Sequence, residues 1–427
     1  MGSVKDLITD DSKAGKLYVP PKVDEFGRGA WNVSGRFSVG DLKDKIPPVE
    51  INDKAEALTM MVGNFFEWMA NNYPDIPTCY EGLMDADGKI VDTQTLLDKG
   101  DTTNVVVMKL AHVPGTYSPD ITPKNEQLEI YRKAIASGEL QCAVADVESI
   151  FRNGFPLGSS TFKKIFGAAG RKADYEKVAT YEDTVKVLDN IRGVVEVKGL
   201  GFFPDLGMLL RKSGLRETIP NPGHILDEFV YNTTTKFEAA GDREITEADA
   251  RVYSGLDEEG YNIWANEMFP QSTEAQIRYC AERGIVNIDG KGEAVAYKRK
   301  PVITDFMCTP DENRLMLEVE VCGENLLIPT NKEIQRAIFR AAGIYEVIDD
   351  AKVLAEGAGN VDAWKDYVDQ LCEKRNIDIR EVTEHSCNMM SYAIAEVANR
   401  ALGKTVFDAK PIDSWVGEFV PYASRRQ

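Results

Sequence analysis

The sequence is poor in histidine, has no closely spaced cysteines and contains no long apolar run, and each shortage excludes a class of protein. Its three histidines form no HxxxH or HxH pattern, so a histidine-ligated metal centre is not expected. Its seven cysteines are widely spaced and include no CxxC pair, which indicates reduced thiols and not a disulfide framework or a zinc site. Uninterrupted apolar stretches of about 18 residues are also missing, and the N-terminal MGSVKDLITDD lacks the apolar segment of a signal peptide. We therefore expect a cytoplasmic protein without a membrane partner.

Basic charge and the common nucleotide-binding motifs are also scarce. The chain carries 69 acidic and 50 basic side chains, a net charge of −19, which opposes binding to nucleic acid because that binding depends on cations that neutralise phosphate. It has no GxxxxGK[ST], GxGxxG or HExxH motif, so P-loop, Rossmann and zincin proteins are not supported. A repeat with a period of about 20 to 50 residues is missing too, which excludes solenoids and propellers.

What remains is an ordinary globular composition, 43% hydrophobic and 28% charged over 427 residues. A chain of this length predicts two or three subdomains, since single cores stop growing near about 250 to 300 residues. Such an acidic protein can still bind phosphorylated metabolites if lysine, arginine and Mg²⁺ are concentrated in one cleft.

The order of apolar and turn-forming residues predicts an α+β fold in four regions. Residues 1–110 are predicted to form a lobe of short strands, with an amphipathic helix over residues 53–71 and a buried strand over residues 104–110. Residues 111–139 begin rich in proline and end in a helix that stops at Gly138, as an insertion or hinge element would.

The other two regions are predicted as a mixed body and a helical tail. Residues 140–325 contain the strand-like segments AVADVESIFRN, GIVNIDGKGEAVA and PVITDFMCT, and a helix capped by Gly284. Residues 326–427 repeat apolar residues at helical spacing in NKEIQRAIFRAAGIYEVIDDAKVLAE, DAWKDYVDQLCEKR and SCNMMSYAIAEVANRALG.

The segment DGKGE carries the first group of residues that indicates chemistry. On a strand, alternate residues share a face, so Asp289, Lys291 and Glu293 would project together. Carboxylates beside a lysine suit a Mg²⁺-nucleotide site, because hard oxygens hold the cation while the ammonium neutralises phosphate. A solvated charged strand face produces the same spacing, and the pattern alone does not separate the two.

The turn Gly158-Ser159-Ser160 indicates a second site. It precedes a predicted helix, so its N–H groups and hydroxyls suit a sugar phosphate, to which the upstream Arg152 can add a bidentate grip. A plain helix N-cap by Ser159 or Ser160 is the alternative.

The third segment follows three consecutive threonines. The cations Lys236 and Arg243, with Asp242 beside the arginine, could hold a polyanionic substrate or form a solvated loop.

Taken in order, the motifs resemble those of the SAICAR synthetase family, the phosphoribosylaminoimidazole-succinocarboxamide synthases. The matching segments are GSVKDL at 2–7, FSVGD at 37–41, IPT at 76–78, VESIFRNGFPLGSS at 147–160, TTKFE at 234–238, DGKGE at 289–293 and TDFMCTPDENR at 304–314. The resemblance implies a small N-terminal β lobe of protein-kinase-like shape over a larger α+β body with a helical C-terminal region. It also implies ATP in the cleft, with Mg²⁺.

The same resemblance implies roles for individual residues. It implies that the nucleotide is contacted by Lys5, Lys109, Leu110, Glu148, Glu293 and Asp305, the last two holding Mg²⁺. It implies catalytic roles between the substrates for Asp289, Lys291 and Arg314. It implies that the other substrates are contacted by Ser38, Asp41, Arg152, Ser159, Ser160, Lys236, Asp242 and Arg243.

The implied reaction is a ligation, in which ATP phosphorylates phosphoribosyl aminoimidazole carboxylate and the amine of aspartate attacks the acyl phosphate. A homo-oligomer is compatible with this expectation. Phe306 stands where the family has a second acidic residue, Glu312 and Asn313 replace paired serines, and Gly292 replaces a large apolar residue. These departures leave two alternatives, a paralogous ATP-dependent ligase for another heterocyclic carboxylate or amine and a non-catalytic nucleotide-binding regulatory protein.

Overall fold

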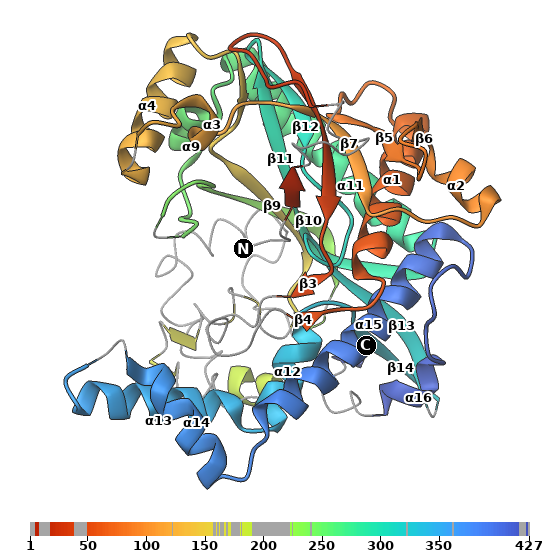
Figure 1. Ribbon diagram of the computed structural model, residues 1–427, viewed down its shortest axis with the longest axis vertical. Helices are drawn as coiled ribbons and strands as arrows, with labels where there is room; N and C mark the ends of the chain where they lie inside the picture. The colour runs from red at the N-terminus through yellow and green to blue at the C-terminus, as the bar shows by residue number, and fades with distance from the viewer. Residues whose placement is uncertain are drawn as a thin grey trace.

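The computed structural model describes residues 5–7, 18–37, 49–121, 123–156, 159, 162, 166–167, 170–171, 180, 182–189, 223, 225–239, 241–321, 323–360, 363–417 and 424–425. These residues form two large antiparallel sheets and a two-stranded ribbon, with helices around them (Figure 1). The α+β class expected from the sequence is confirmed.

The N-terminal sheet has five strands in the order β1-β2-β7-β5-β6. Their bounds are β1 Lys5–Leu7, β2 Gly27–Val33, β5 Tyr80–Met84, β6 Ile90–Val91 and β7 Val105–Leu110. The ribbon consists of β3 Arg36–Phe37 and β4 Val49–Glu50, and the helices are α1 Lys54–Asn72 and α2 Thr93–Lys99. The helix predicted over 53–71 and the strand predicted over 104–110 are confirmed as α1 and β7. The buried face of α1 carries Leu58, Met61, Phe65 and Met69, which follow one another at spacings of three and four residues.

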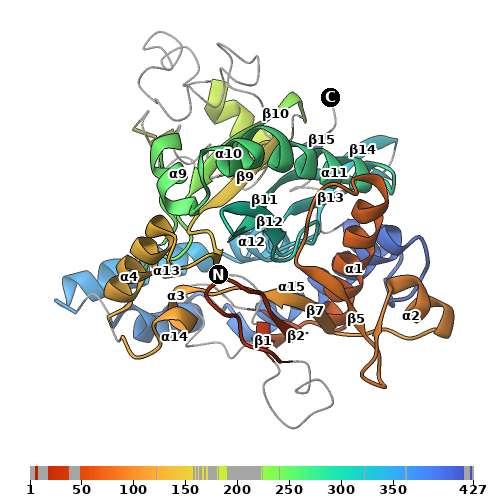
Figure 2. The same cartoon turned by 90° about the horizontal axis from the view of Figure 1, so that it is seen from above.

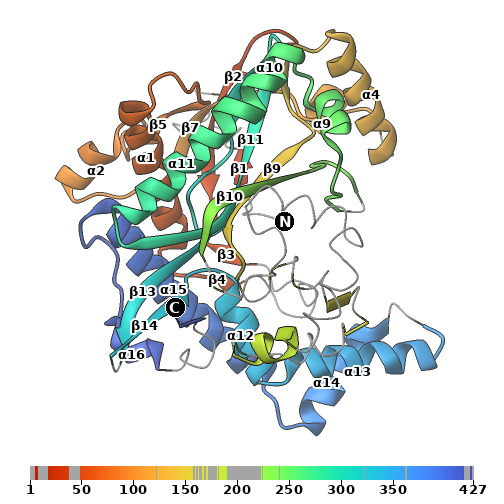
Figure 3. The same cartoon turned by 180° about the vertical axis from the view of Figure 1, so that it is seen from behind.

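The second sheet is organised around β11, Ile285–Tyr297, which pairs with four other strands. The others in this sheet are β8 Cys142–Val144, β9 Glu148–Gly154, β10 Ile225–Thr234, β12 Lys300–Thr304, β13 Arg314–Val321, β14 Glu324–Pro329 and β15 Ser424–Arg425. The helices of this region are α9 Glu247–Ser254, α10 Glu258–Ile263, the π-helix η4 Trp264–Met268 and α11 Phe269–Ala281. From behind, α10 and α11 run along one face of the sheet (Figure 3).

Two expected strands are shorter than predicted. The segment AVADVESIFRN is divided between β8 and β9. The segment PVITDFMCT leaves the strand after Thr304, because Asp305 and Cys308 have φ angles of 66° and 60°, which a strand does not accommodate. Helix α11 ends at Ala281 with Glu282 as its C-cap, so the prediction that Gly284 caps it was wrong by two residues. Gly284 has φ 66° and lies in the turn that follows.

Residues 111–139 form α3 Pro114–Tyr117 and α4 Lys124–Ser137, and Gly138 at φ 79° ends α4 as predicted. Figures 1 and 2 place α4 and α9 on the opposite side of the molecule from α2.

The C-terminal region is helical, as predicted, with bounds α12 Glu333–Ala341, α13 Ile344–Gly357, α14 Trp364–Lys374, α15 Ile379–Leu402 and α16 Ile412–Val416. The first predicted helical stretch is divided into α12 and α13 by Gly343 at φ 74°. Helix α15 packs against α1, and one hydrophobic core joins Phe65 of α1, Ile303 of β12 and Ala393 of α15. None of the helices that the structure describes is both long and apolar enough to cross a membrane.

Candidate active site

The face of β11 that carries Asp289, Lys291 and Glu293 is the centre of the candidate site. Strand register places Asp289 opposite Arg152 and Lys291 opposite Ile150 of β9, so the alternate residues of both strands face the same side. The shared face predicted for the three charged residues is therefore observed. Glu293 is only 3% exposed, which excludes a fully solvated strand face.

Lys291 lies at the centre of a cluster of carboxylates. Its ammonium is 2.5 Å from Glu148, 2.9 Å from Glu312 and 3.0 Å from Glu293. Burial would lower the pKa of Lys291, but the three carboxylates outweigh that effect and raise it. The pKa of Glu148 is raised, because burial and the nearby Glu293 favour its neutral form more than Lys291 favours its charged form.

A second lysine completes this group. Lys236, from the turn after β10, also forms an ion pair with Glu293. We call these residues the lysine cluster: Lys236, Lys291, Glu148, Glu293 and Glu312. Three carboxylates oppose two ammonium groups, so the cluster has a surplus negative charge that suits a bound cation.

A different group surrounds Asp289. Its Oδ2 accepts hydrogen bonds from Arg152 at 3.0 Å and Arg314 at 2.5 Å. Arg314 also lies 3.4 Å from Glu333 of α12, which pairs in addition with Arg336. We call these residues the arginine cluster: Arg152, Arg314, Arg336, Asp289 and Glu333.

The arginine cluster has an excess of positive charge near buried groups. The pKa of Arg152 is lowered, because burial and repulsion from Arg314 outweigh the attraction of Asp289, which would raise it. Although burial would raise the pKa of Glu333, the guanidinium groups of Arg336, Arg314 and Arg340 outweigh it and lower the pKa. Two guanidinium groups from separate strands thus meet on one carboxylate, an arrangement that suits an anionic ligand.

The departures from the family pattern have structural explanations. Asn313 is buried, accepts a hydrogen bond from the N–H of Cys308 at 2.9 Å and donates one to Gln276 at 2.9 Å, so it holds the loop before Arg314. A Cβ at Gly290 would lie 1.9 Å from the Asn313 amide, and one at Gly292 would lie 2.9 Å from the Phe269 ring. The glycines of DGKGE therefore leave room for these side chains.

Of the two metal residues predicted from the resemblance, Glu293 lies on β11 and Asp305 follows the end of β12, its partner strand. Glu293 is opposite Thr304, the residue before Asp305, and Asp305 accepts a hydrogen bond from the N–H of Phe306 at 2.8 Å. Within the described residues, no group of three or more His, Cys, Asp or Glu is arranged to hold a metal ion. A magnesium site on Glu293 and Asp305 stays a prediction, and Phe306 is a buried core residue.

Lys109 and Leu110, predicted from the resemblance to border adenine, lie at the end of β7. The Lys109 ammonium is 5.8 Å from the centroid of the Phe26 ring, which stacks at 4.4 Å on Tyr297 at the end of β11. Leu110 is buried beside it. Their contact with adenine stays a prediction.

Three of the predicted substrate residues lie outside the described part of the chain. These are Ser38, Asp41 and Ser160. Only the backbone of Lys5 is described, in β1. Ser159 is buried, and its N–H donates to the carbonyl of Pro156 at 3.0 Å.

Lys236 and Arg243, expected together, make different contacts. Lys236 reaches Glu293, whereas Arg243 pairs with Glu238 at 3.0 Å and Asp242 is exposed.

Solved SAICAR synthetases are similar to this chain. The SAICAR synthase from Saccharomyces cerevisiae, complexed with SAICAR, is 15% identical, and the match covers 94% of this chain and 95% of that chain with a TM-score of 0.44. The enzyme from Pyrococcus horikoshii OT3 is 14% identical, with 80% and 96% covered and a TM-score of 0.41. A SAICAR synthetase in complex with ADP is 14% identical, with 80% and 96% covered and a TM-score of 0.40. No protein-family model matches the sequence, and no curated protein does.

Sequence reasoning missed several residues of this site. Glu312 was noted only as a departure, although it lies two positions before Arg314 within the matched segment. For Glu333, the only feature of the sequence that could have indicated a role in the site was its place at the start of a predicted helix. The buried Lys54 of α1, 3.0 Å from Asp311, had no such feature, because its partner is remote in the sequence.

Proposed function

We propose that the chain is an ATP- and Mg²⁺-dependent ligase that joins the carboxylate of phosphoribosyl aminoimidazole carboxylate to the amine of aspartate. The observation that carries the proposal is the placement of the lysine cluster and the arginine cluster side by side on one strand face. Such a ligase must neutralise nucleotide phosphates next to a second, phosphorylated substrate. The ordered motifs that resemble SAICAR synthetases support the same proposal.

The Mg²⁺ part of the proposal rests on the resemblance, which assigns the ion to Glu293 of the lysine cluster and to Asp305 just after β12. Carboxylate oxygens are hard ligands of the kind that Mg²⁺ takes from proteins. Glu293 and Asp305 would hold the ion, which supplies neutralisation of phosphate charge when bound. Lys291 and Lys236 would neutralise charge that remains on the nucleotide.

The arginine cluster would bind the phosphate of the ribotide. Arg152 and Arg314 offer planar guanidinium groups that match phosphate oxygens, and Asp289 balances their charge.

The proposed reaction has two steps. In the first step, the substrate carboxylate attacks the γ-phosphorus of ATP, ADP leaves, and an acyl phosphate forms. The amine of aspartate then attacks the acyl carbon, loses a proton and expels phosphate. The protein's side chains position the substrates and neutralise their phosphate charges, and no side chain is required as a nucleophile.

One observation favours a second candidate. Glu312, which stands where the family pattern has a serine, contacts Lys291 directly and adds a negative charge to the lysine cluster. A paralogous ligase that takes another heterocyclic carboxylate or another amine would explain this change.

Phosphate release by the purified protein tests the proposal. We expect release only when ATP, Mg²⁺, phosphoribosyl aminoimidazole carboxylate and aspartate are all present, with the succinocarboxamide product detected by mass spectrometry. Release that requires a different carboxylate or amine supports the paralogous ligase. Nucleotide binding without turnover across a panel of carboxylates and amines contradicts both and indicates a regulatory protein.

A further inference from the structure

The position of Lys236 in the lysine cluster is determined by a buried carboxylate outside that cluster. Lys236 begins the turn after β10, which is closed by hydrogen bonds between Thr235 and Arg243 at 2.9 and 3.0 Å. Asp146, between β8 and β9, accepts hydrogen bonds from the N–H groups of Lys236 at 3.2 Å and Phe237 at 2.9 Å. One carboxylate oxygen therefore fixes the backbone from which the lysine side chain reaches Glu293.

Asp146 is itself held by Arg132 of α4. The other oxygen, Oδ2, lies 2.6 Å from Nε and 2.5 Å from Nη2 of Arg132, and Asp146 is 0% exposed. The same guanidinium lies 3.2 Å from Glu238 in the turn and 4.2 Å from the centroid of the Tyr253 ring. Arg132 thus neutralises a buried charge and contacts the turn directly.

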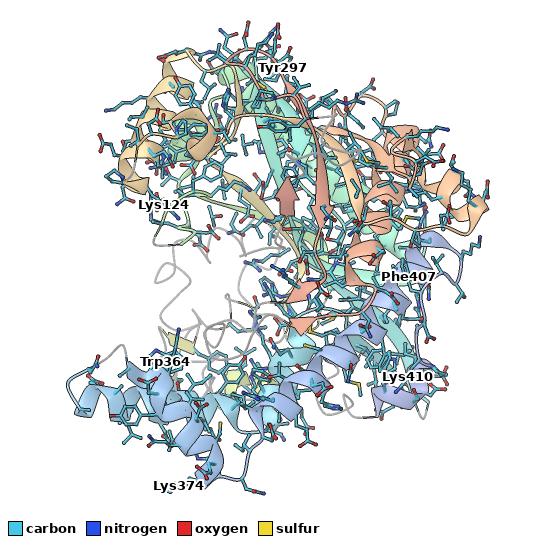
Figure 4. The ribbon with its side chains drawn as sticks, viewed as in Figure 1. Lys124, Tyr297, Trp364, Lys374, Phe407 and Lys410 are labelled. Atoms are coloured by element: carbon cyan, nitrogen blue, oxygen red, sulfur yellow. The ribbon has the colours of Figure 1, made fainter. Side chains whose placement is uncertain are left out.

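The neighbouring Tyr131 fixes α4 on the sheet. Its hydroxyl oxygen lies 2.7 Å from the carbonyl oxygens of both His112 and Val144, which share its single O–H donor, and its ring centroid lies 6.0 Å from that of Phe237. Helix α4 begins at Lys124, which is labelled in Figure 4, and it packs against α9 (Figure 1). The helix therefore holds one basic side chain, that of Arg132, against the turn.

We propose that α4 is a positioning element for the lysine cluster, in which Arg132 acts through Asp146 to fix Lys236 against Glu293. This gives residues 111–139, predicted from the sequence as an insertion or hinge element, a role in the site. The structural part stands independently, whereas its kinetic consequence rests on the proposed function. Arg132 and Asp146 are positioning residues, since neither belongs to the lysine cluster.

The structural test replaces the charged group of Arg132, that of Asp146, or both. Arg132→Met keeps a long apolar stem but leaves Asp146 without its cation, while Asp146→Asn keeps an oxygen that accepts the two N–H groups. Arg251→Met is the matched control, because Arg251 also forms an ion pair, at 2.9 Å to Glu247, and stacks on a tyrosine, at 4.5 Å from the Tyr261 centroid. Hydrogen–deuterium exchange of peptides that contain residues 235–239 is measured in every variant.

We expect Arg132→Met to speed exchange in this turn by roughly tenfold or more, because a buried unpaired carboxylate destabilises the local structure. The double variant with Asp146→Asn should return exchange close to that of Asp146→Asn alone, since no uncompensated charge remains. Arg251→Met should leave the turn unchanged. Equal exchange in Arg132→Met and Arg251→Met overturns the proposal, and so does a double variant that exchanges as fast as Arg132→Met. If Arg132→Met does not fold, Asp146→Asn and the double variant still give the comparison.

Turnover provides the second readout. Arg132→Met should lower kcat/KM, Arg132→Lys should recover part of the loss, and Arg132→Met should add little in a Lys236→Met background because both changes act on one lysine. Additive losses in that background contradict positioning through Lys236. A wild-type protein without turnover contradicts the proposed function, while the exchange results still decide whether α4 positions the turn.

Discussion

The lysine cluster and the arginine cluster occupy the same strand face but have opposite charge balances. The lysine cluster sets three carboxylates against two ammonium groups, and the arginine cluster sets three guanidinium groups against two carboxylates. Part of this difference comes from β9, the strand next to β11, which contributes Glu148 to the lysine cluster and Arg152 to the arginine cluster. A negative surplus suits a cation with its nucleotide, whereas guanidinium forks suit a phosphate. One strand can thus serve two ligands of different chemistry.

The largest effect is expected when the lysine cluster loses its central cation. In Lys291→Met, the carboxylates of Glu148, Glu293 and Glu312 face one another without that ammonium. We expect a loss of about 3 kcal/mol in the free energy of unfolding and a fall in turnover of roughly a thousandfold. Urea denaturation and phosphate release measure the two. Lys300→Met, which removes a more exposed ion pair with Asp257, is the control, and similar small effects in both variants would contradict a central role for Lys291.

The next effect concerns the carboxylate shared by two arginines. Asp289→Asn removes the negative charge between Arg152 and Arg314, so we expect a loss of about 2 kcal/mol in the free energy of unfolding. Inorganic phosphate should then raise the melting temperature of the variant more than that of the wild type, because an anion replaces the lost charge. An equal or smaller shift in the variant would argue against an anion site there.

A smaller effect is expected when Arg152 loses its planar guanidinium group but keeps its positive charge. Arg152→Lys keeps the positive charge but loses the planar pair of donors. We expect KM for the phosphorylated substrate to rise by about tenfold, with KM for ATP nearly unchanged. If the two KM values rise together, the arginine cluster does not serve a separate ligand.

The smallest effect is a difference in pH dependence between two glutamates. The pKa of Glu148 is raised, so its contribution to stability is present below its unfolded value, near 4.5, and is lost as pH rises through the folded pKa. The pKa of Glu333 is lowered, so its contribution is present above that value and is lost as pH falls through the folded pKa.

Glutamine variants make this difference measurable. Relative to wild type, Glu148→Gln should gain stability as pH rises above about 4.5. Glu333→Gln should instead lose stability as pH rises towards about 4.5, and the loss should then stay constant at higher pH. Urea denaturation between about pH 2 and 8 gives both curves. Parallel curves would mean that the two clusters do not have opposite electrostatics.

Most elements of the fold could be predicted from periodicity. Helix α1, strand β7, strand β11 and the C-terminal helices have the spacing of apolar residues that a buried face requires. Predictions were wrong where single residues adopt positive φ angles, as at Asp305 and Gly343, since these angles depend on the surrounding packing. The pattern around Asp305 was still strand-like, so sequence gave no reason to end β12 at Thr304.

For the candidate site, the sequence by itself determined that Asp289, Lys291 and Glu293 face one way, because alternation along a strand is a local property of the backbone. Only the tertiary structure decided their partners. Glu312, Lys236 and the pair Arg132–Asp146 come from segments whose proximity depends on which strands and helices pack together. Charge patterns along a chain do not encode these long-range contacts, whereas burial makes them obligatory, since a charge removed from water must find an opposite charge or a hydrogen bond.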